Sequence, residues 1–279
     1  MSIQNLNAST LTRLICFAFA ALLIALPAMA QDATGDAAAE ADDLLGTIET
    51  EEDEDAPPRW LTTVAFGGSL TSGNSDTLGL NLSVGSEKKS EKNEFALGLS
   101  GSYGETDSET STEIANLFFN YKRMFDKSYI FSNTSLFHDK IALIAYRFTT
   151  AVGYGRNVID SERTTLGLEG GVAYIHEDYE DDPTGAMPTL DADDKFSLRL
   201  GNNFEYRFSP TAKLWQTAEY MPEFDDFDSY LVNAAIGVEA AMTTTLSLRF
   251  SIEDRYNSRP PYDSKRNDLI SVIALAINL

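Results

Sequence analysis

Residues 195–208 read KFSLRLGNNFEYRF, and residues 246–255 read LSLRFSIEDR. In both segments apolar residues alternate with polar or charged ones, so that every second side chain would point to the same face of an extended strand. A strand of a transmembrane β-barrel has this pattern because one face meets lipid and the other meets a polar interior. The two segments therefore predict membrane-spanning β-strands.

The same alternation continues from Trp60 to the end of the chain, in segments of about 10 to 15 residues, a length that crosses a bilayer at a tilt. We expect an all-β fold, an antiparallel up-and-down transmembrane barrel of the outer-membrane type, over residues 60–279. Alternation is least clear in 128–137 and 211–221. The twelve expected strands are 60–72, 76–87, 93–104, 112–124, 128–137, 146–157, 163–176, 194–208, 211–221, 228–240, 243–257 and 266–279.

The connections between these segments alternate in length, as they do in outer-membrane barrels, where periplasmic turns are short and external loops are long. The expected short turns are 88–92, 125–127, 158–162, 209–210 and 241–242. The expected longer loops are 105–111, 138–145, 177–193, 222–227 and 258–265. Only the first connection, 73–75, is too short for an external loop. This order of short and long connections places both termini in the periplasm of a Gram-negative cell.

Aromatic residues gather near the ends of the expected strands, where the interfacial girdles of membrane barrels lie. A soluble β-sandwich, the alternative for an alternating pattern, would expose these rings to water. The residues concerned are Trp60, Tyr103, Tyr121, Tyr129, Tyr146, Tyr174, Tyr206, Tyr220 and Tyr256. We therefore expect outer-membrane lipid and lipopolysaccharide as partners.

The last segment runs to the final residue, with alternate residues from Leu269 to Leu279 on one face. This arrangement resembles the C-terminal signal that the barrel-insertion machinery reads during biogenesis. That signal usually ends in an aromatic residue, whereas this chain ends in leucine. The insertion machinery is a further expected partner, and the sequence does not indicate an oligomeric state.

The N-terminus has the pattern of a secretory signal peptide. Arg13 precedes the apolar run 14–26, and Ala28-Met29-Ala30 is a small-residue cleavage site, which predicts a cleaved signal over residues 1–30. Cys16 is the only cysteine, and it lies inside this run. The mature chain is therefore expected to have no disulfide, no cysteine-bound metal and no lipid anchor.

The formal net charge of −22 excludes nucleic acid as an expected partner, since its phosphates require a basic surface. Much of this charge is local, because residues 31–59 contain 11 aspartates and glutamates against Arg59 alone. Such a composition predicts a disordered acidic linker. The linker could be a solvated spacer, a specific binding tail or a plug for the lumen.

Several short motifs resemble the YdiY-like family of salt-induced outer-membrane proteins, which is classed under a domain of unknown function. The resemblance covers roughly residues 60–279. It implies an outer-membrane location and a link to salt or osmotic stress, and it brings no catalytic residues. The motifs are Gly73-Asn74-Ser75-Asp76-Thr77, Tyr121-Lys122-Arg123, Tyr146-Arg147, Gly153-Tyr154-Gly155, Tyr256 through Pro261, and Asn267-Asp268.

Catalysis is not expected from this sequence. The chain has two histidines, His138 and His176, each near the predicted outer end of a strand and beside acidic residues. A nucleophile, a base and an orienting group could be combined there, but no nucleophile elbow or other catalytic signature surrounds a serine. We predict a non-enzyme without a cofactor.

The loop after residue 177 is rich in acidic side chains, which could hold calcium or magnesium through their oxygens. The spacing lacks the glycine and the terminal glutamate of an EF-hand, so a solvated loop is favoured. The candidate metal ligands are Asp181, Asp182, Asp191 and Asp193.

Charged residues of both signs fall on the polar face of the expected strands. Glu94 belongs to this set, and the candidate lumen-lining residues are Lys122, Arg147, Glu169, Arg199, Glu205, Arg207, Glu239, Arg249, Glu253 and Arg255. Twelve strands lie between small filled barrels and the 16- to 18-stranded porins with wide channels. One hypothesis is a narrow pore or passive transporter for ions or small polar solutes, with the inward charges as selectivity elements. The alternative is a structural or surface-binding barrel whose lumen is closed by salt bridges and whose acidic outer loops bind cations.

Overall fold

The computed structural model describes residues 59–72, 77–106, 109–181, 185, 188, 190–261 and 265–279. The predicted signal peptide, most of the predicted acidic linker and the motif residues 73–76 lie outside this part of the chain. Within it, no helix is long and apolar enough to cross a membrane.

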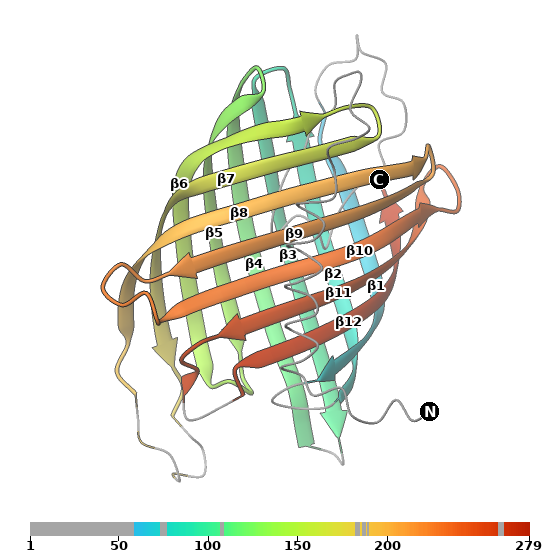
Figure 1. Ribbon diagram of the computed structural model, residues 1–279. Coiled ribbons are helices and arrows are strands. Elements are labelled where there is room, and N and C mark those ends of the chain that lie inside the picture. Colours follow the sequence, from blue (N-terminus) through green and yellow to red (C-terminus); the bar gives the residue numbers. More distant parts are fainter. Residues whose placement is uncertain are drawn as a thin grey trace, which may run out of the picture.

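Twelve antiparallel strands form one closed barrel, in which each strand pairs with its neighbours in sequence and β1 pairs with β12 (Figure 1). The strands are β1 (Leu61–Ser72), β2 (Thr77–Lys89), β3 (Asn93–Thr106), β4 (Glu109–Phe125), β5 (Ser128–Asp139), β6 (Ile144–Asp160), β7 (Thr164–Tyr179), β8 (Asp193–Ser209), β9 (Ala212–Pro222), β10 (Tyr230–Ala241), β11 (Leu246–Asn257) and β12 (Asn267–Asn278). The predicted fold class and number of strands are confirmed.

The two strands with the least clear alternation, β5 and β9, are both formed. Their alternation is weak because their inward faces are partly apolar. In β5 the inward side chains Tyr129 and Phe131 are buried in the interior. In β9 the inward side chains include Trp215 and Met221, which are 4% and 3% exposed. An aromatic interior therefore removes the contrast between the two faces without removing the strand.

The strands are strongly tilted to the barrel axis (Figure 1). The shear of the barrel is about 16 residues. A path that starts at Val64 and passes from each residue to its partner on the next strand returns to β1 about 16 residues further along the strand. A stagger of this size in a twelve-stranded barrel corresponds to a tilt of roughly 45°. The tilt determines which side chains of distant strands meet inside the barrel.

Side chains alternate between an exposed apolar outer face and a buried polar interior. On β11, Leu248 and Phe250 are 45% and 44% exposed, whereas Ser247, Arg249 and Ser251 are 1–2% exposed. Many other large apolar residues are exposed in the same way, including four consecutive outward leucines and valines of β2, namely Leu78, Leu80, Leu82 and Val84. An apolar belt of this kind suits lipid rather than water.

The two ends of the barrel differ in their connections. At one end, here called the turn end, the connections are 90–92, 126–127, 161–163, 210–211 and 242–245. At the other, here called the loop end, the connections include 180–192, 223–229 and 258–266. The longer loops expected over 105–111 and 138–145 are wrong. β3 continues through a bulge at Gly104/Glu105 to Thr106 and β4 begins at Glu109, while β5 extends to Asp139 and β6 begins at Ile144.

Aromatic pairs lie on the outer surface near both ends. Tyr230 stacks on Tyr256 and meets Tyr220 edge-on at the loop end, with ring centroids 5.7 Å and 5.4 Å apart. Tyr206 and Phe208 form an edge-to-face pair at the turn end. Rings at these two levels match the girdles that lie at the two interfaces of a bilayer.

Glycines make room for the inward aromatic rings of the neighbouring strands. A Cβ at Gly155 would overlap the ring of Tyr129, a Cβ at Gly153 would overlap Phe131, and a Cβ at Gly237 would overlap Trp215. Gly153 and Gly155 belong to one of the family motifs. Their role in the structure is to let β6 lie flat beneath the aromatic side chains of β5.

We expect Gly155→Ala to destabilise the barrel by about 1–3 kcal/mol, because the added methyl group forces Tyr129 out of a packed site. Urea unfolding of the protein refolded in lipid vesicles measures this loss. Gly170→Ala is the matched control, since the nearest atom to its Cβ is a Leu200 methyl carbon at 3.9 Å. Equal unfolding midpoints for the two variants contradict this role of Gly155.

Candidate functional site in the barrel interior

The centre of the interior is a cluster of buried charges, the Glu169 network, formed by Lys122, Tyr129, Glu169, Arg199 and Glu219. One carboxylate oxygen of Glu169 accepts a hydrogen bond of 2.8 Å from the Tyr129 hydroxyl and lies 3.1 Å from the Lys122 ammonium. The other accepts a bond of 3.0 Å from Arg199 Nη1. A carboxylate at the centre of three donors neutralises the cations that surround it.

Arg199 on β8 connects Glu169 on β7 to Glu219 on β9. Its Nε donates to Glu219 Oε2 at 2.7 Å, and Glu219 Oε1 accepts a bond of 3.2 Å from Asn233. The Arg199 guanidinium also lies 4.6 Å from the ring centroid of Phe131. These contacts follow the wall over the neighbouring strands β7, β8, β9 and β10. The contacts of Lys122, Tyr129 and Phe131 add β4 and β5 from across part of the lumen.

The side chains of Lys122, Glu169 and Arg199 are 3%, 0% and 1% exposed. Burying three ions is costly unless each finds an opposite charge and hydrogen bonds. The network consists of two cations, two carboxylates and the Tyr129 hydroxyl, so each cation lies beside an opposite charge. It therefore fills part of the lumen with a polar layer.

Two further groups of ion pairs lie toward the turn end. Glu239 accepts hydrogen bonds from Ser247 at 2.7 Å and from Arg249 at 3.0 Å. Glu205 accepts bonds from Arg207 at 2.8 Å and from Lys213 at 3.1 Å. Together with the Glu169 network, they place paired charges along the inner wall from β7 to β11.

A contact crosses the lumen near the loop end and is here called the outer bridge. The guanidinium of Arg255 on β11 lies 5.1 Å from the ring centroid of Phe137 on β5, the strand opposite it in the barrel. The guanidinium of Arg147 lies 5.7 Å from the same ring and is ion-paired with Glu177. Arg255 is also paired with Glu253 at 3.4 Å. The outer bridge thus consists of one aromatic ring held between two arginines.

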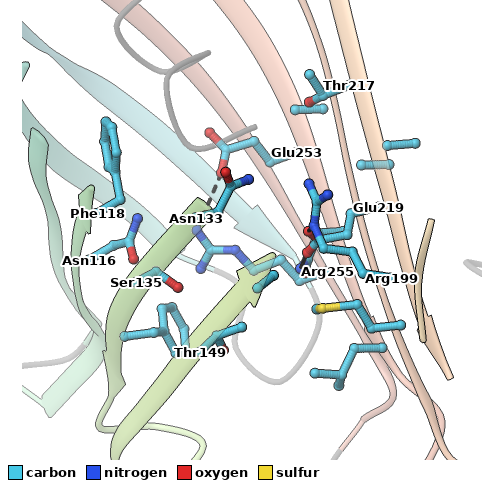
Figure 2. A pocket seen from close by; sticks show the side chains of 18 of the residues that line it. Asn116, Phe118, Asn133, Ser135, Thr149, Arg199, Thr217, Glu219, Glu253 and Arg255 are labelled. Atoms are coloured by element: carbon cyan, nitrogen blue, oxygen red, sulfur yellow. Dashed lines mark hydrogen bonds and ion pairs between the residues drawn. The ribbon is translucent and has the colours of Figure 1, made fainter. Parts of the chain in front are cut away.

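A cavity of about 200 Å³ lies between the Glu169 network and the outer bridge. Figure 2 shows Asn116, Asn133, Ser135 and Thr149 on one wall and Arg199, Thr217 and Glu219 on the other, with Arg255 extending between the walls. A smaller cavity of about 40 Å³ lies against β1, β2, β3 and β12, and Glu253 and Arg255 line both cavities. The Glu253–Arg255 pair is therefore the partition between two interior spaces.

The structure brings all ten candidate lumen residues into ion pairs. Lys122, Glu169 and Arg199 meet in one network, Glu239 meets Arg249, Glu205 meets Arg207, Glu253 meets Arg255, and Arg147 meets Glu177. Arg207 is the most exposed of the ten, with 38% of its side chain accessible. Glu94, at 5% exposure, lies beside Lys122 at the turn end.

Sequence reasoning missed Phe137, Trp215 and Glu219, which lie on β5 or β9, and it placed Tyr129 in an aromatic girdle. That placement is wrong, because the Tyr129 ring is fully buried in the lumen and its hydroxyl bonds to Glu169. All four residues could have been placed inside by counting alternate positions along each strand, although the two faces of these strands look alike in sequence. Glu177 was assigned to a loop, whereas it lies in β7 and pairs with Arg147.

The predicted metal ligands stay a prediction. Asp182 lies outside the described residues, and Asp193 is ion-paired with Lys195 at 3.2 Å. Among the described residues, no group of three or more histidine, cysteine or acidic side chains is arranged to hold a metal ion. Asp181 and Asp191 are therefore not gathered into such a group with described neighbours.

The two histidines lie on the outer surface near the loop end. His138 Nδ1 is 2.9 Å from the carbonyl oxygen of Ala145. His176 lies between Asp194 and the hydroxyl of Tyr146, at 2.8 Å and 3.2 Å. Both arrangements join the ends of neighbouring strands.

We expect Glu169→Gln to destabilise the folded barrel by about 3–5 kcal/mol, because Lys122 and Arg199 lose the charge that neutralises them while staying buried. Lys122→Met should cost less, since Glu169 keeps Arg199 and Tyr129 as partners. Urea unfolding in lipid vesicles compares the two variants with the native protein. An equal loss from both variants contradicts the central position of Glu169.

Solved structures with similar folds are outer-membrane barrels. The NanC porin matches with a TM-score of 0.53 and 11% identity, over 77% of this chain and 100% of that chain. The translocator domain of the autotransporter NalP from Neisseria meningitidis matches with a TM-score of 0.49 and 14% identity, over 81% and 90%. An outer membrane channel from Pseudomonas putida F1 matches with a TM-score of 0.49 and 10% identity, over 84% and 100%. At these identities the NanC likeness shows the fold alone.

No curated protein matches the sequence. The profile of the family described as "Protein of unknown function, DUF481" matches residues 64–278, which is nearly the whole barrel. This is the family that the YdiY-like motifs indicated, so that resemblance is confirmed. The chain belongs to the DUF481 family.

Proposed function

We propose that this protein is a narrow pore of the outer membrane, through which ions or small polar solutes pass without an energy source. The observation that carries the proposal is a cavity of about 200 Å³, lined by both polar and apolar side chains, inside a closed barrel with an apolar outer surface. A barrel that served only as a support would be more stable with an interior filled by apolar side chains.

The outer bridge and the Glu169 network would be the two constrictions along the path. Both consist of long side chains that extend into the lumen, and long side chains change rotamer far more easily than strands move. A solute would pass the outer bridge, occupy the cavity, and leave beside the Glu169 network. At each constriction the solute would give up hydrating water for contacts with charged and hydroxyl groups of the protein.

The paired charges limit how strongly the path can select by sign. Arg147, Arg199 and Arg255 face the cavity, but Glu219 and Glu253 face it as well. An open lumen with balanced charges would pass both cations and anions, with the preference set by whichever charge lies nearest the constriction. Arg255 occupies that position in the outer bridge.

We place the turn end in the periplasm and the loop end outside the cell, because outer-membrane barrels carry their short turns on the periplasmic side. The two ends of the barrel chain lie together, since Thr62 and Leu279 exchange backbone hydrogen bonds. Outer-membrane lipid, lipopolysaccharide and the insertion machinery are then its partners. A role in salt or osmotic stress fits a passive pore, and the proposal includes neither catalysis nor a cofactor.

A closed structural barrel is the second candidate. It is favoured by the almost complete burial of Lys122, Glu169 and Arg199, which fill the lumen at their level. In that case the loops at the outer end would be the functional surface.

Purified protein in planar bilayers should show small, steady unitary currents in potassium chloride. Arg255→Ser should raise the unitary conductance, because it removes the side chain that crosses the lumen, and should shift the reversal potential toward cation preference, because it removes a positive charge from the constriction. Single-channel recording in a salt gradient measures both effects.

Arg259→Ser is the control, because Arg259 pairs with Asp226 in the loops, with 58% of its side chain exposed. It should leave conductance and reversal potential as in the native protein. Silent bilayers at high protein concentration would rule out the pore and favour the closed barrel.

A further inference from the structure

The larger cavity is lined by groups that form hydrogen bonds in both directions. Hydroxyls and amides face it from both walls, including Asn116, Asn133, Ser135, Thr149 and Thr217. Three aromatic rings, Phe118, Phe137 and Trp215, face it as well. Ligand sites typically combine apolar faces with a few convergent polar groups.

Two buried atoms in this lining have no hydrogen-bond partner among the described residues. One is the indole nitrogen Nε1 of Trp215, a donor on a residue that is 4% exposed. The other is Oε1 of Glu253, an acceptor on a residue that is 8% exposed. Leaving such buried groups unsatisfied is unfavourable. A ligand that both donates and accepts would satisfy the two atoms at once.

The charges around the cavity favour an uncharged ligand. Arg199 is neutralised by Glu169 and Glu219, and Arg255 is paired with Glu253. An ion gains no unpaired opposite charge in this space, so it can pass the lining without being held there. A hydroxyl group donates and accepts without a net charge, and therefore fits the lining better than a carboxylate or an ammonium group.

The size of the cavity limits which uncharged solutes can bind in it. A cavity of about 150 Å³ can hold one benzene ring. A volume of about 200 Å³ therefore has room for a single six-membered ring with its substituents. The aromatic faces could pack against the C–H face of such a ring while its hydroxyls reach the polar wall.

We infer that the larger cavity is a binding site for a single small, uncharged polyhydroxylated solute of monosaccharide size, with Trp215 and Glu253 among the residues that hold it. The inference rests on the proposed function only in that the solute must reach the lumen. Arg255, which lines this cavity and extends between its walls, would have to swing aside for entry.

Trp215 provides a direct test, because the chain contains two tryptophans and Trp60→Phe leaves Trp215 as the single fluorophore. Titration of this variant, folded in detergent micelles, with D-glucose should give a saturable change in emission. Gluconate, which has a similar size and a negative charge, should bind at least about tenfold more weakly, a difference of about 1.4 kcal/mol. Raffinose at the same osmolarity should give no saturable change.

Adding Glu253→Gln or Thr217→Val should raise the dissociation constant for glucose about tenfold. Glu162→Gln in the β6–β7 turn is the matched control and should leave it unchanged. The two cavity variants change different strands, β11 and β9, so that misfolding of one, detected by heat-modifiable gel mobility, leaves the other as the test.

The absence of a saturable change with glucose, or equal binding of gluconate, would overturn the inference. These outcomes can be told apart from a failure of the proposed pore function. A saturable glucose signal with silent bilayers would keep the binding site and remove the pore, whereas conductance without a glucose signal would keep the pore and remove the site.

Discussion

The backbone hydrogen bonds between β1 and β12 are the contacts on which the rest of the molecule depends. Ten residue pairs from Thr63↔Asn278 to Ser72↔Leu269 close the barrel, so no strand keeps a free edge. In lipid an open edge would leave amides and carbonyls without partners, at a cost of several kcal/mol for each group. Closure also separates an outside from an inside, and this separation gives the alternating residues their two environments.

The interior charges follow from that separation. Once the outer face is apolar, polar side chains of successive strands share one confined space and must neutralise one another. They do so in layers, with the Glu169 network and the pairs of Glu239 and Glu205 toward the turn end and the outer bridge toward the loop end. The cavity is the space left between these layers. The same arrangement thus explains why the lumen is narrow and where a solute could be held.

The strands could be predicted from sequence because alternation is a local property, as in 195–208, where each residue's face follows from its parity. Tyr129 and Trp215 weakened that pattern in β5 and β9, since an inward aromatic ring looks like a lipid-facing one. The partners inside the lumen were beyond prediction. Lys122 and Glu169 meet across three strands because of the stagger of the whole barrel, which no single segment specifies. The extended β3–β4 hairpin was missed because Glu109, Thr110 and Ser111 are polar on both faces.

Moving one tryptophan by one residue tests the separation of inside from outside most directly. In a Trp60→Phe background, Trp215 faces the interior, whereas Leu214→Trp combined with Trp215→Phe puts the indole on the outer face at the same level of β9. Both proteins are folded into vesicles whose acyl chains carry bromine, which quenches tryptophan on contact. The account predicts strong quenching for the Leu214→Trp variant and little for Trp215. Equal quenching at the two positions would contradict it.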